Sequence, residues 1–125
     1  MKTATDPRHQ HRVTLMKHLY SAAFQKQPDA AVAHIWPHLT QIDELVVKCA
    51  PEWPIAKLNP LDLAILRLAV YELIIDRQAP FKVIIDEAVE LAKEFGSESS
   101  PSFINGALGK AVKDYLPEGT HESQP

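Results

Sequence analysis

The stretch that most constrains the fold is residues 61–75, LDLAILRLAVYELII, because it is apolar on nearly every side of a helix. Three charged residues interrupt it: Asp62, Arg67 and Glu72. Asn59 and Pro60 precede the run as an N-cap and a first-turn proline, and Pro80 is expected to stop the helix. A helix that is apolar all round is usually buried at the centre of a bundle. The sequence therefore predicts an all-α protein arranged around this segment.

Helical spacing of apolar residues also dominates the rest of the chain, and no alternating run has the length that would indicate a strand. We expect further helices over residues 7–25, 29–36, 40–49, 84–95 and 100–115. Gly96 suits the position that follows a helix. Residues 50–58 contain two prolines and are interpreted as the connection between two helical halves.

The composition is that of a soluble globular protein, with 125 residues, 46% hydrophobic and 23% charged. Charged residues break the longest apolar stretches, so no membrane-spanning segment is predicted. The N-terminus lacks the apolar region of a signal peptide. Cys49 is the single cysteine, which excludes an internal disulfide and a multi-cysteine zinc site and favours a core role. We therefore expect a cytoplasmic, reducing location.

Charge is distributed unevenly along the chain. The net charge of −3 argues against a generally basic nucleic-acid binder. Residues 1–26, however, carry five cations and one acid, and they also contain His9, His11 and His18. An anion-binding site is expected in this first segment, because local clustering of charge matters more than the total.

On a helical wheel of residues 7–25, Arg8 and Arg12 fall on the line of the apolar stripe. Burying either arginine without a partner would be costly. The helix can overshoot the core, so that both guanidinium groups face a groove and bind phosphate through their planar forks. Alternatively, the arginines pair with the acidic second half, or the N-terminus is unstructured. Spacing alone leaves these alternatives open.

The sequence discourages a catalytic interpretation. It has no glycine-rich phosphate loop, nucleophile elbow or recognised metal-ligand spacing, so we predict no enzyme activity, no cofactor and no metal site. His34 and His38 are four residues apart, but Pro37 lies between them, which favours surface residues over metal ligands. Three acids of the predicted helix 84–95 are expected on its solvated face: Asp86, Glu87 and Glu90.

The stretch GSESSPSF, residues 96–103, offers serine hydroxyls at the start of a predicted helix. Such a terminus favours an anion, because its first N–H groups lack helical partners. Phe103 falls in the first turn, where an exposed ring would stack on a nucleobase. Spacing by itself favours a core position for Phe103.

Three blocks between residues 59 and 110 resemble the NusB family of bacterial transcription antitermination factors: NPLDLAILRLAVYELI, PFKVIIDEAVELAKEFGSE and SPSFINGALGK. The segment RVTLMKHLY resembles the family's arginine-rich opening helix more loosely. The resemblance implies a single all-α domain, residues 1–125, made of two small packed helical bundles, at about 7–50 and 59–116, with a frayed tail at 117–125.

The same resemblance implies that the protein pairs with NusE, the small-subunit ribosomal protein S-ten, within the transcription elongation complex. Together they would bind boxA-containing nascent RNA and support rRNA transcription. The RNA-binding residues implied for this chain are Arg8, His9, His11, Arg12, Ser99, Ser102 and Phe103. The residues implied to face NusE are Tyr20, Phe24 and Asp62.

The chain departs from the family pattern at several of these places. His9 and Gln10 stand where consecutive arginines are common, and Gly109 stands where an acid is frequent. Ser99 and Ser102 replace an acid and a lysine. The segment between residues 27 and 40 is short for the usual second helix, so the N-terminal bundle is expected to be trimmed, with apolar surface left for a possible homodimer.

Two alternatives stand beside this interpretation. The thinned basic cluster favours a NusB-like protein-interaction module with little specific RNA binding. The other alternative comes from the resemblance itself: RNA cytosine methyltransferases carry a similar domain at their N-terminus, so the chain would be an accessory fragment of such an enzyme, although it has no room for their catalytic domain. If the RNA-binding interpretation holds, His9 and His11 should raise RNA affinity as the pH falls from neutral, because an unperturbed histidine titrates at about pH 6.5.

Overall fold

The computed structural model describes residues 6–116, and within them it contains helices and turns but no strand. The α-helices are α1 (Pro7–Gln25), α2 (Leu39–Cys49), α3 (Pro60–Tyr71), α4 (Phe81–Phe95) and α5 (Ser100–Lys110). Two π-helical segments, η4 (Glu72–Asp76) and η5 (Ala111–Tyr115), extend α3 and α5. Short 3₁₀ turns lie at η1 (Ala30–Val32), η2 (Trp36–His38) and η3 (Ile55–Lys57). The predicted all-α fold class is confirmed.

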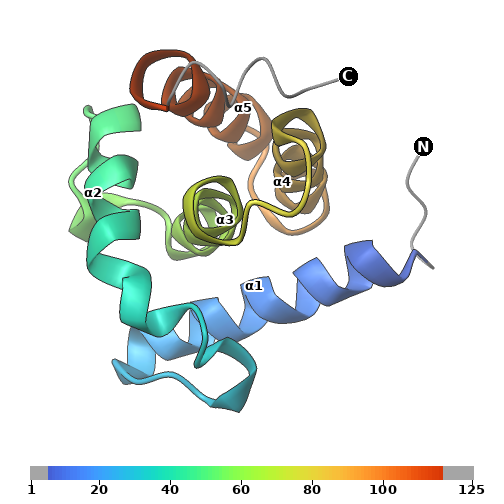
Figure 1. The fold of residues 1–125 in the computed structure, drawn as a ribbon. Helices are drawn as coiled ribbons and strands as arrows, with labels where there is room; N and C mark the ends of the chain where they lie inside the picture. The colour runs from blue at the N-terminus through green and yellow to red at the C-terminus, as the bar shows by residue number, and fades with distance from the viewer. Residues whose placement is uncertain (1–5, 117–125) are drawn as a thin grey trace.

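Helix α3 lies in the middle of the molecule, with the other four α-helices around it (Figure 1). The side-chain oxygen of Asn59 accepts hydrogen bonds from the backbone N–H groups of Leu61 and Asp62, at 2.8 and 3.3 Å, and so caps the first turn. Residues 62–70 are all buried. The prediction that this apolar run forms the centre of the fold is confirmed.

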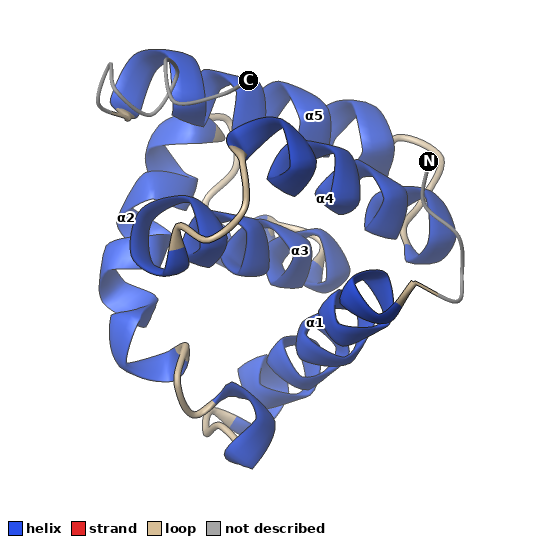
Figure 2. Cartoon of the chain, turned by 45° about the vertical axis from the view of Figure 1, so that its right-hand side comes forward, coloured by secondary structure: helices blue, strands red, loops and turns tan. Residues whose placement is uncertain are grey.

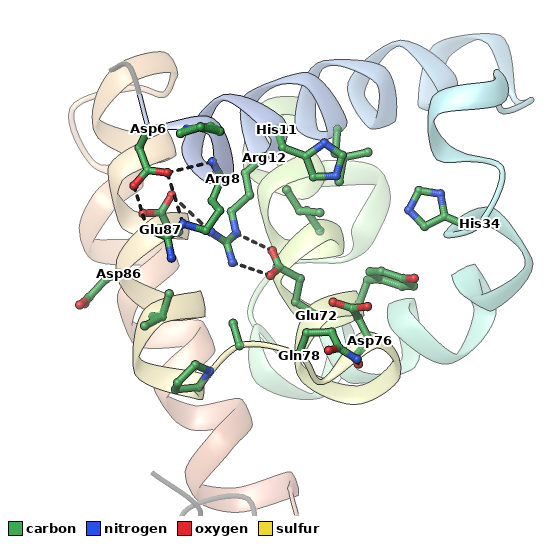
Figure 3. Close-up of a pocket in the computed structure, with 17 residues that line it drawn as sticks. Asp6, Arg8, His11, Arg12, His34, Glu72, Asp76, Gln78, Asp86 and Glu87 are labelled. Carbon is green, nitrogen blue, oxygen red and sulfur yellow. Dashed lines mark hydrogen bonds and ion pairs between the residues drawn. The ribbon is translucent and has the colours of Figure 1, made fainter. Parts of the chain in front are cut away.

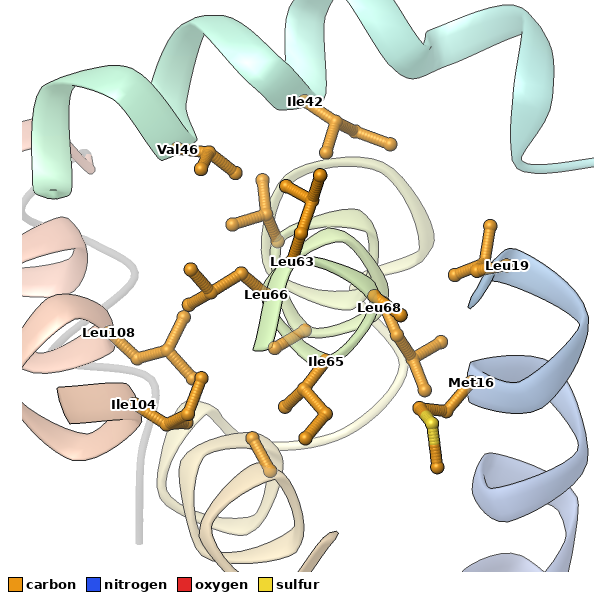
Figure 4. Packing of buried hydrophobic residues seen from close by; sticks show 14 of the residues in the cluster. Met16, Leu19, Ile42, Val46, Leu63, Ile65, Leu66, Leu68, Ile104 and Leu108 are labelled. Carbon is orange, nitrogen blue, oxygen red and sulfur yellow. The ribbon is translucent and has the colours of Figure 1, made fainter. Parts of the chain in front are cut away.

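Side chains leave α3 in several directions to fill the core (Figure 4). Leu63 points toward α2, Leu66 toward α5 and Leu68 toward α1. The buried apolar residues form one connected cluster, which includes Cys49 as predicted. The described helices therefore share one core, and the division into bundles at 7–50 and 59–116 stays a prediction.

The charged residues of the central run are tied to different neighbours. Arg67 donates two hydrogen bonds to the carboxylate of Asp43 on α2, at 2.9 and 2.8 Å. Glu72 accepts two from Arg12 on α1. Asp62 differs, because its Oδ1 is buried and finds no hydrogen-bond partner within residues 6–116.

The connection between α1 and α2 differs from the prediction. The expected helix at residues 29–36 is replaced by the turns η1 and η2, and Asp29 caps η1 by accepting from the N–H of Ala31 at 3.0 Å. A segment bounded by Pro28 and Pro37 is too short for a stable α-helix, because the first turn is costly to nucleate. Figure 2 shows this connection as a loop-rich corner beside the C-terminal end of α1.

The central element and α4 end for other physical reasons than the sequence predicted. The central element ends at Asp76, before Pro80, because Arg77 takes a left-handed conformation (φ 56°) and donates its N–H to the Glu72 carbonyl at 2.8 Å. Gly96 does follow α4, but its φ of −90° is open to any residue. Glycine is needed there because a Cβ would lie 2.6 Å from the Cβ of Ser100. The predicted tail at 117–125 lies outside the described residues.

Candidate functional site

The first turn of α1 presents Arg8 to solvent. Asp6 caps the helix by accepting from the backbone N–H of Arg8 at 2.8 Å, and Pro7 occupies the first helical position. The guanidinium of Arg8 also pairs with Asp6 at 3.2 Å, but its side chain is 85% exposed. An exposed pair of this kind is weak, so the guanidinium is accessible to an anion.

Arg12 is held differently, one turn further along α1. Its Nε and Nη2 donate to the two carboxylate oxygens of Glu72 at 2.9 and 2.8 Å, and its Nη1 lies 3.7 Å from Glu87. The side chain is only 12% exposed. Of the alternatives that the sequence left open, the structure shows the ion pair with the acidic second half. An RNA phosphate would have to compete with Glu72 for the same donors.

His9 lies in the interior between α1 and α4, at 4% exposure. Its Nδ1 is 2.9 Å from Glu87 Oε1, and its Nε2 contacts Glu94 Oε1. The hydrogen bond with Glu87 raises the pKa of His9, burial opposes this, and Glu94 adds to the increase. Both ring nitrogens already contact carboxylates, so the predicted direct contact of His9 with RNA does not fit this placement.

The position of Glu87 differs from the predicted one. The sequence placed Asp86, Glu87 and Glu90 on a solvated helix face, and Asp86 is indeed exposed. Glu87 is 4% exposed and turned toward His9 and Arg12 of α1. The spacing along α4 could not reveal this, because the partners lie far earlier in the chain.

A groove of about 820 Å³ separates the N-terminal half of α1 from η4 and the start of α4 (Figure 3). The α1 wall contributes Arg8, His11 and Arg12, whereas the facing wall is rich in acids: Glu72, Asp76, Asp86 and Glu87. His11 is exposed, as its predicted role requires. Arg12 thus meets Glu72 across a groove of mixed charge, whereas Arg8 pairs with Asp6 at the start of its own helix.

The two spaced histidines are placed against an aromatic ring. His34 meets Tyr71 edge-on at 5.6 Å between ring centroids, and His38 lies at 6.3 Å from the same ring. Within residues 6–116, no group of three or more His, Cys, Asp or Glu side chains is arranged to hold a metal ion. No helix of these residues is long and apolar enough to cross a membrane.

The α4–α5 loop is fixed by its serines. Ser100 is buried, and its Oγ accepts from the N–H of Ser97 at 2.9 Å, whereas Ser99 and Ser102 are exposed. Phe103 is half-buried and packs on the edge of the core, so part of its ring stays open to solvent. Its position combines the core packing that spacing favours with the partial exposure that an RNA-binding role would need.

Helix α1 lies alongside the end of α4 that leads into this loop. His9 contacts Glu94, and the Lys17 ammonium lies 5.1 Å from the centre of the Phe95 ring. These contacts bring the first half of α1 close to the loop that carries Ser99. Sequence reasoning did not single out Lys17. Its place on the polar side of α1 was the one feature that could have indicated it.

A second surface lies on the C-terminal half of α1. Tyr20 and Phe24 pack edge-to-face with 5.0 Å between ring centroids, at 37% and 61% exposure. Exposed aromatic side chains are enriched in protein interfaces. Asp62, predicted to face the same partner, lies in the first turn of α3 and is 8% exposed.

Comparisons with known proteins agree with this architecture. A family model described as "NusB family" matches residues 9–113. The "Transcription antitermination protein NusB" of Chloroflexus aggregans is 47% identical over 85 residues, which cover 66% of this chain and 57% of that protein. The protein of the same description from Thermotoga maritima is 39% identical over 85 residues, covering 68% and 60%. The chain thus spans less than two thirds of the length of these relatives.

A solved structure is similar over a greater length. The structure titled "T. maritima NusB, P3121, Form 2" superposes with a TM-score of 0.81 at 30% sequence identity. The superposition covers 98% of this chain and 99% of that one.

Proposed function

The chain belongs to the NusB family, and on that premise we propose that it is a cytoplasmic transcription antitermination factor. In this proposal it binds boxA-type rRNA leader RNA together with NusE, as part of the elongation complex, and so supports rRNA transcription. It acts by binding and catalyses no reaction.

The observation that carries the RNA proposal is the exposed Arg8 guanidinium on the helix that lies beside the α4–α5 loop. Arginine suits phosphate because its planar fork donates to two oxygens at once. The loop adds exposed hydroxyls at Ser99 and Ser102, and Phe103 offers part of a ring. Single-stranded RNA is recognised by this combination of cations, hydrogen-bonding groups and aromatic stacking.

The partner surface is proposed at Tyr20 and Phe24. Their rings are exposed and already packed against each other, so little side-chain freedom remains to be lost on binding. Asp62, in the first turn of α3, is proposed to face NusE as well; its side chain is 8% exposed, and its Oδ1 is buried without a partner in the part of the chain that the structure describes.

A protein-interaction module with weak RNA binding is the second candidate function. The observation that favours it is the ion pair of Arg12 with Glu72, which engages a guanidinium that RNA would otherwise use. The acids that line the groove beside Arg8 would also repel phosphate.

The test is fluorescence anisotropy of a labelled boxA-type RNA, with a scrambled RNA as reference, at two salt concentrations and with or without NusE. Arg8→Gln should weaken binding and reduce the slope of log affinity against log salt by about 1. Lys57→Gln, at an exposed cation on η3, is the matched control and should retain wild-type binding. If NusE binds but RNA selectivity is absent under all conditions, the interaction module is the better description.

A further inference from the structure

The imidazole of His9 is enclosed by two carboxylates of α4. Nδ1 contacts Glu87 Oε1 at 2.9 Å, and Nε2 contacts Glu94 Oε1. An ionised carboxylate accepts hydrogen bonds and donates none, so both ring nitrogens must carry a proton to satisfy the two contacts. With both carboxylates ionised, His9 is an imidazolium in this arrangement, and its side chain is only 4% exposed.

The imidazolium belongs to a larger charged cluster that joins α1 to α4 and η4. Its other members on α1 and η4 are Arg12 and Glu72, and Arg12 also lies 3.7 Å from Glu87. Among the described residues that contact one another here, protonated His9 and Arg12 face the carboxylates of Glu72, Glu87 and Glu94. Loss of the His9 proton removes one of these two positive charges. Because the cluster is largely buried, water compensates this imbalance poorly.

Asp6 and Arg8 come just before His9 in the chain and line the same groove as Arg12 and Glu87, and they pair with each other at the surface. The contacts of His9 with α4 fasten the first turns of α1, and Arg8 is the residue immediately before His9. On α4, Glu94 precedes the loop that carries Ser99 by only a few residues. One side chain thus links the helix start that presents Arg8 to the edge of that loop.

We propose that His9 is a positioning residue for RNA recognition: its imidazolium fastens the start of α1 to α4 and thereby holds Arg8 beside the α4–α5 loop. This inference rests on the RNA-binding function proposed above. His9 acts through Arg8 and does not touch RNA. When His9 loses a proton, its ring can donate to only one of Glu87 and Glu94, so one contact between α1 and α4 is lost, the first turns of α1 loosen and RNA affinity falls.

The first experiment uses the free protein and needs no RNA. NMR titration of the imidazole should place the His9 midpoint above about 6.5, and hydrogen exchange of the amides in the first turns of α1 should accelerate through the same midpoint. Glu94→Gln should lower the midpoint, because one carboxylate is removed from a half-exposed position with little change in size. Glu98→Gln, at an exposed acid in the following loop, is the matched control and should leave it unchanged. A wild-type midpoint that does not respond to Glu94→Gln overturns the proposal.

The second experiment measures RNA affinity between pH 6 and pH 9 at constant ionic strength. Wild-type affinity should fall several-fold through the His9 midpoint, and Glu94→Gln should move that fall to lower pH. Glu98→Gln should leave the position of the fall unchanged, because Glu98 is exposed and outside the cluster. RNA binding whose pH dependence ignores Glu94→Gln overturns the positioning role alone. Absence of selective RNA binding at every pH, with the His9 titration as expected, contradicts the proposed function instead.

Discussion

Arg12 on α1 and Glu72 on η4, 60 residues apart in the sequence, form an ion pair with two parallel hydrogen bonds of 2.9 and 2.8 Å. Both side chains are close to buried, at 12% and 13% exposure. The pair joins the first helix to the end of the central element, on the floor of the groove in Figure 3. Its geometry explains why an arginine on the apolar side of α1 is tolerated.

Removing one member of this pair should be costly. Glu72→Gln leaves the Arg12 guanidinium largely buried with a neutral partner, so we expect the free energy of unfolding to fall by about 3 kcal/mol in urea titrations. Glu90→Gln is the matched control, because Glu90 meets Lys93 at the surface and should contribute little. Equal losses in the two variants would show that the Arg12–Glu72 pair contributes no more to the free energy of unfolding than an exposed ion pair does.

Gly96 should not tolerate a side chain. In Gly96→Ala the new Cβ would lie 2.6 Å from the Cβ of buried Ser100, so we expect a destabilisation of about 1–3 kcal/mol. Gly106→Ala is the opposite case, because nothing lies within 4 Å of its Cβ position inside α5. That variant should gain about 0.5–1 kcal/mol. Thermal unfolding of both variants measures the difference, and a stabilised Gly96→Ala would contradict the close approach.

Stability should fall as the pH rises past neutral. The hydrogen bond with Glu87 raises the pKa of His9 in the folded protein, so the folded state binds this proton more tightly than the unfolded state. The resulting stabilisation is fully present below about pH 6.5 and is lost as the pH passes the folded pKa. Urea midpoints at intervals from pH 6 to pH 9 should show this loss for wild type and a flatter profile for His9→Gln. An identical profile in the variant would assign the loss to another group.

Cys49 should be unreactive in the native protein. Burial raises the pKa of its thiol to about 11, so almost no thiolate exists near neutral pH. A thiol reagent such as dithionitrobenzoate should label Cys49 only after addition of denaturant. Rapid labelling of the folded chain would show that α2 opens locally far more often than its packing suggests.

Phe24 should matter to a partner and not to folding. Its ring is 61% exposed, so Phe24→Ser should change the free energy of unfolding by less than about 0.5 kcal/mol. If the aromatic pair with Tyr20 is the NusE surface, affinity for NusE should fall about tenfold or more, as measured by calorimetry. Val47→Ser, at an exposed apolar residue on α2, supplies the control. Unchanged NusE affinity in Phe24→Ser would show that NusE does not bind at this aromatic pair on α1.

The sequence predicted the elements whose signals are local. The bounds of α1 and the capped start of α3 follow from prolines and side chains within a few residues, and both are confirmed. The helix predicted at residues 29–36 was wrong for a local reason, the short span between two prolines, whereas the prediction for Glu87 was wrong because of distant contacts. Glu87 has the spacing of a solvated residue, yet it is buried because His9, 78 residues earlier, packs against it. No pattern along α4 carries that information.

For the candidate site, too, the sequence indicates segments but not the contacts between distant residues. The resemblance predicts a site that includes Arg8, Ser99 and Phe103, and the structure brings α1 alongside the end of α4 that leads to the last two. The spacing could not reveal that Arg12 and His9 face carboxylates of other helices. Ion pairs that close over long stretches of sequence become visible only once the helices are packed.

The charged residues of the central helix also have a consequence for how the chain chooses one fold. A helix that is apolar on every side buries nearly the same apolar area in any rotation about its axis. Because the hydrophobic effect is not directional, it does not by itself determine which rotation the helix adopts. Turning α3 by one residue, about 100°, would carry Arg67 away from Asp43 and Glu72 away from Arg12 together. Each wrongly turned arrangement would bury unmatched charges, which is costly. The two ion pairs thus select one rotation of α3 about its axis, which apolar burial by itself would not specify.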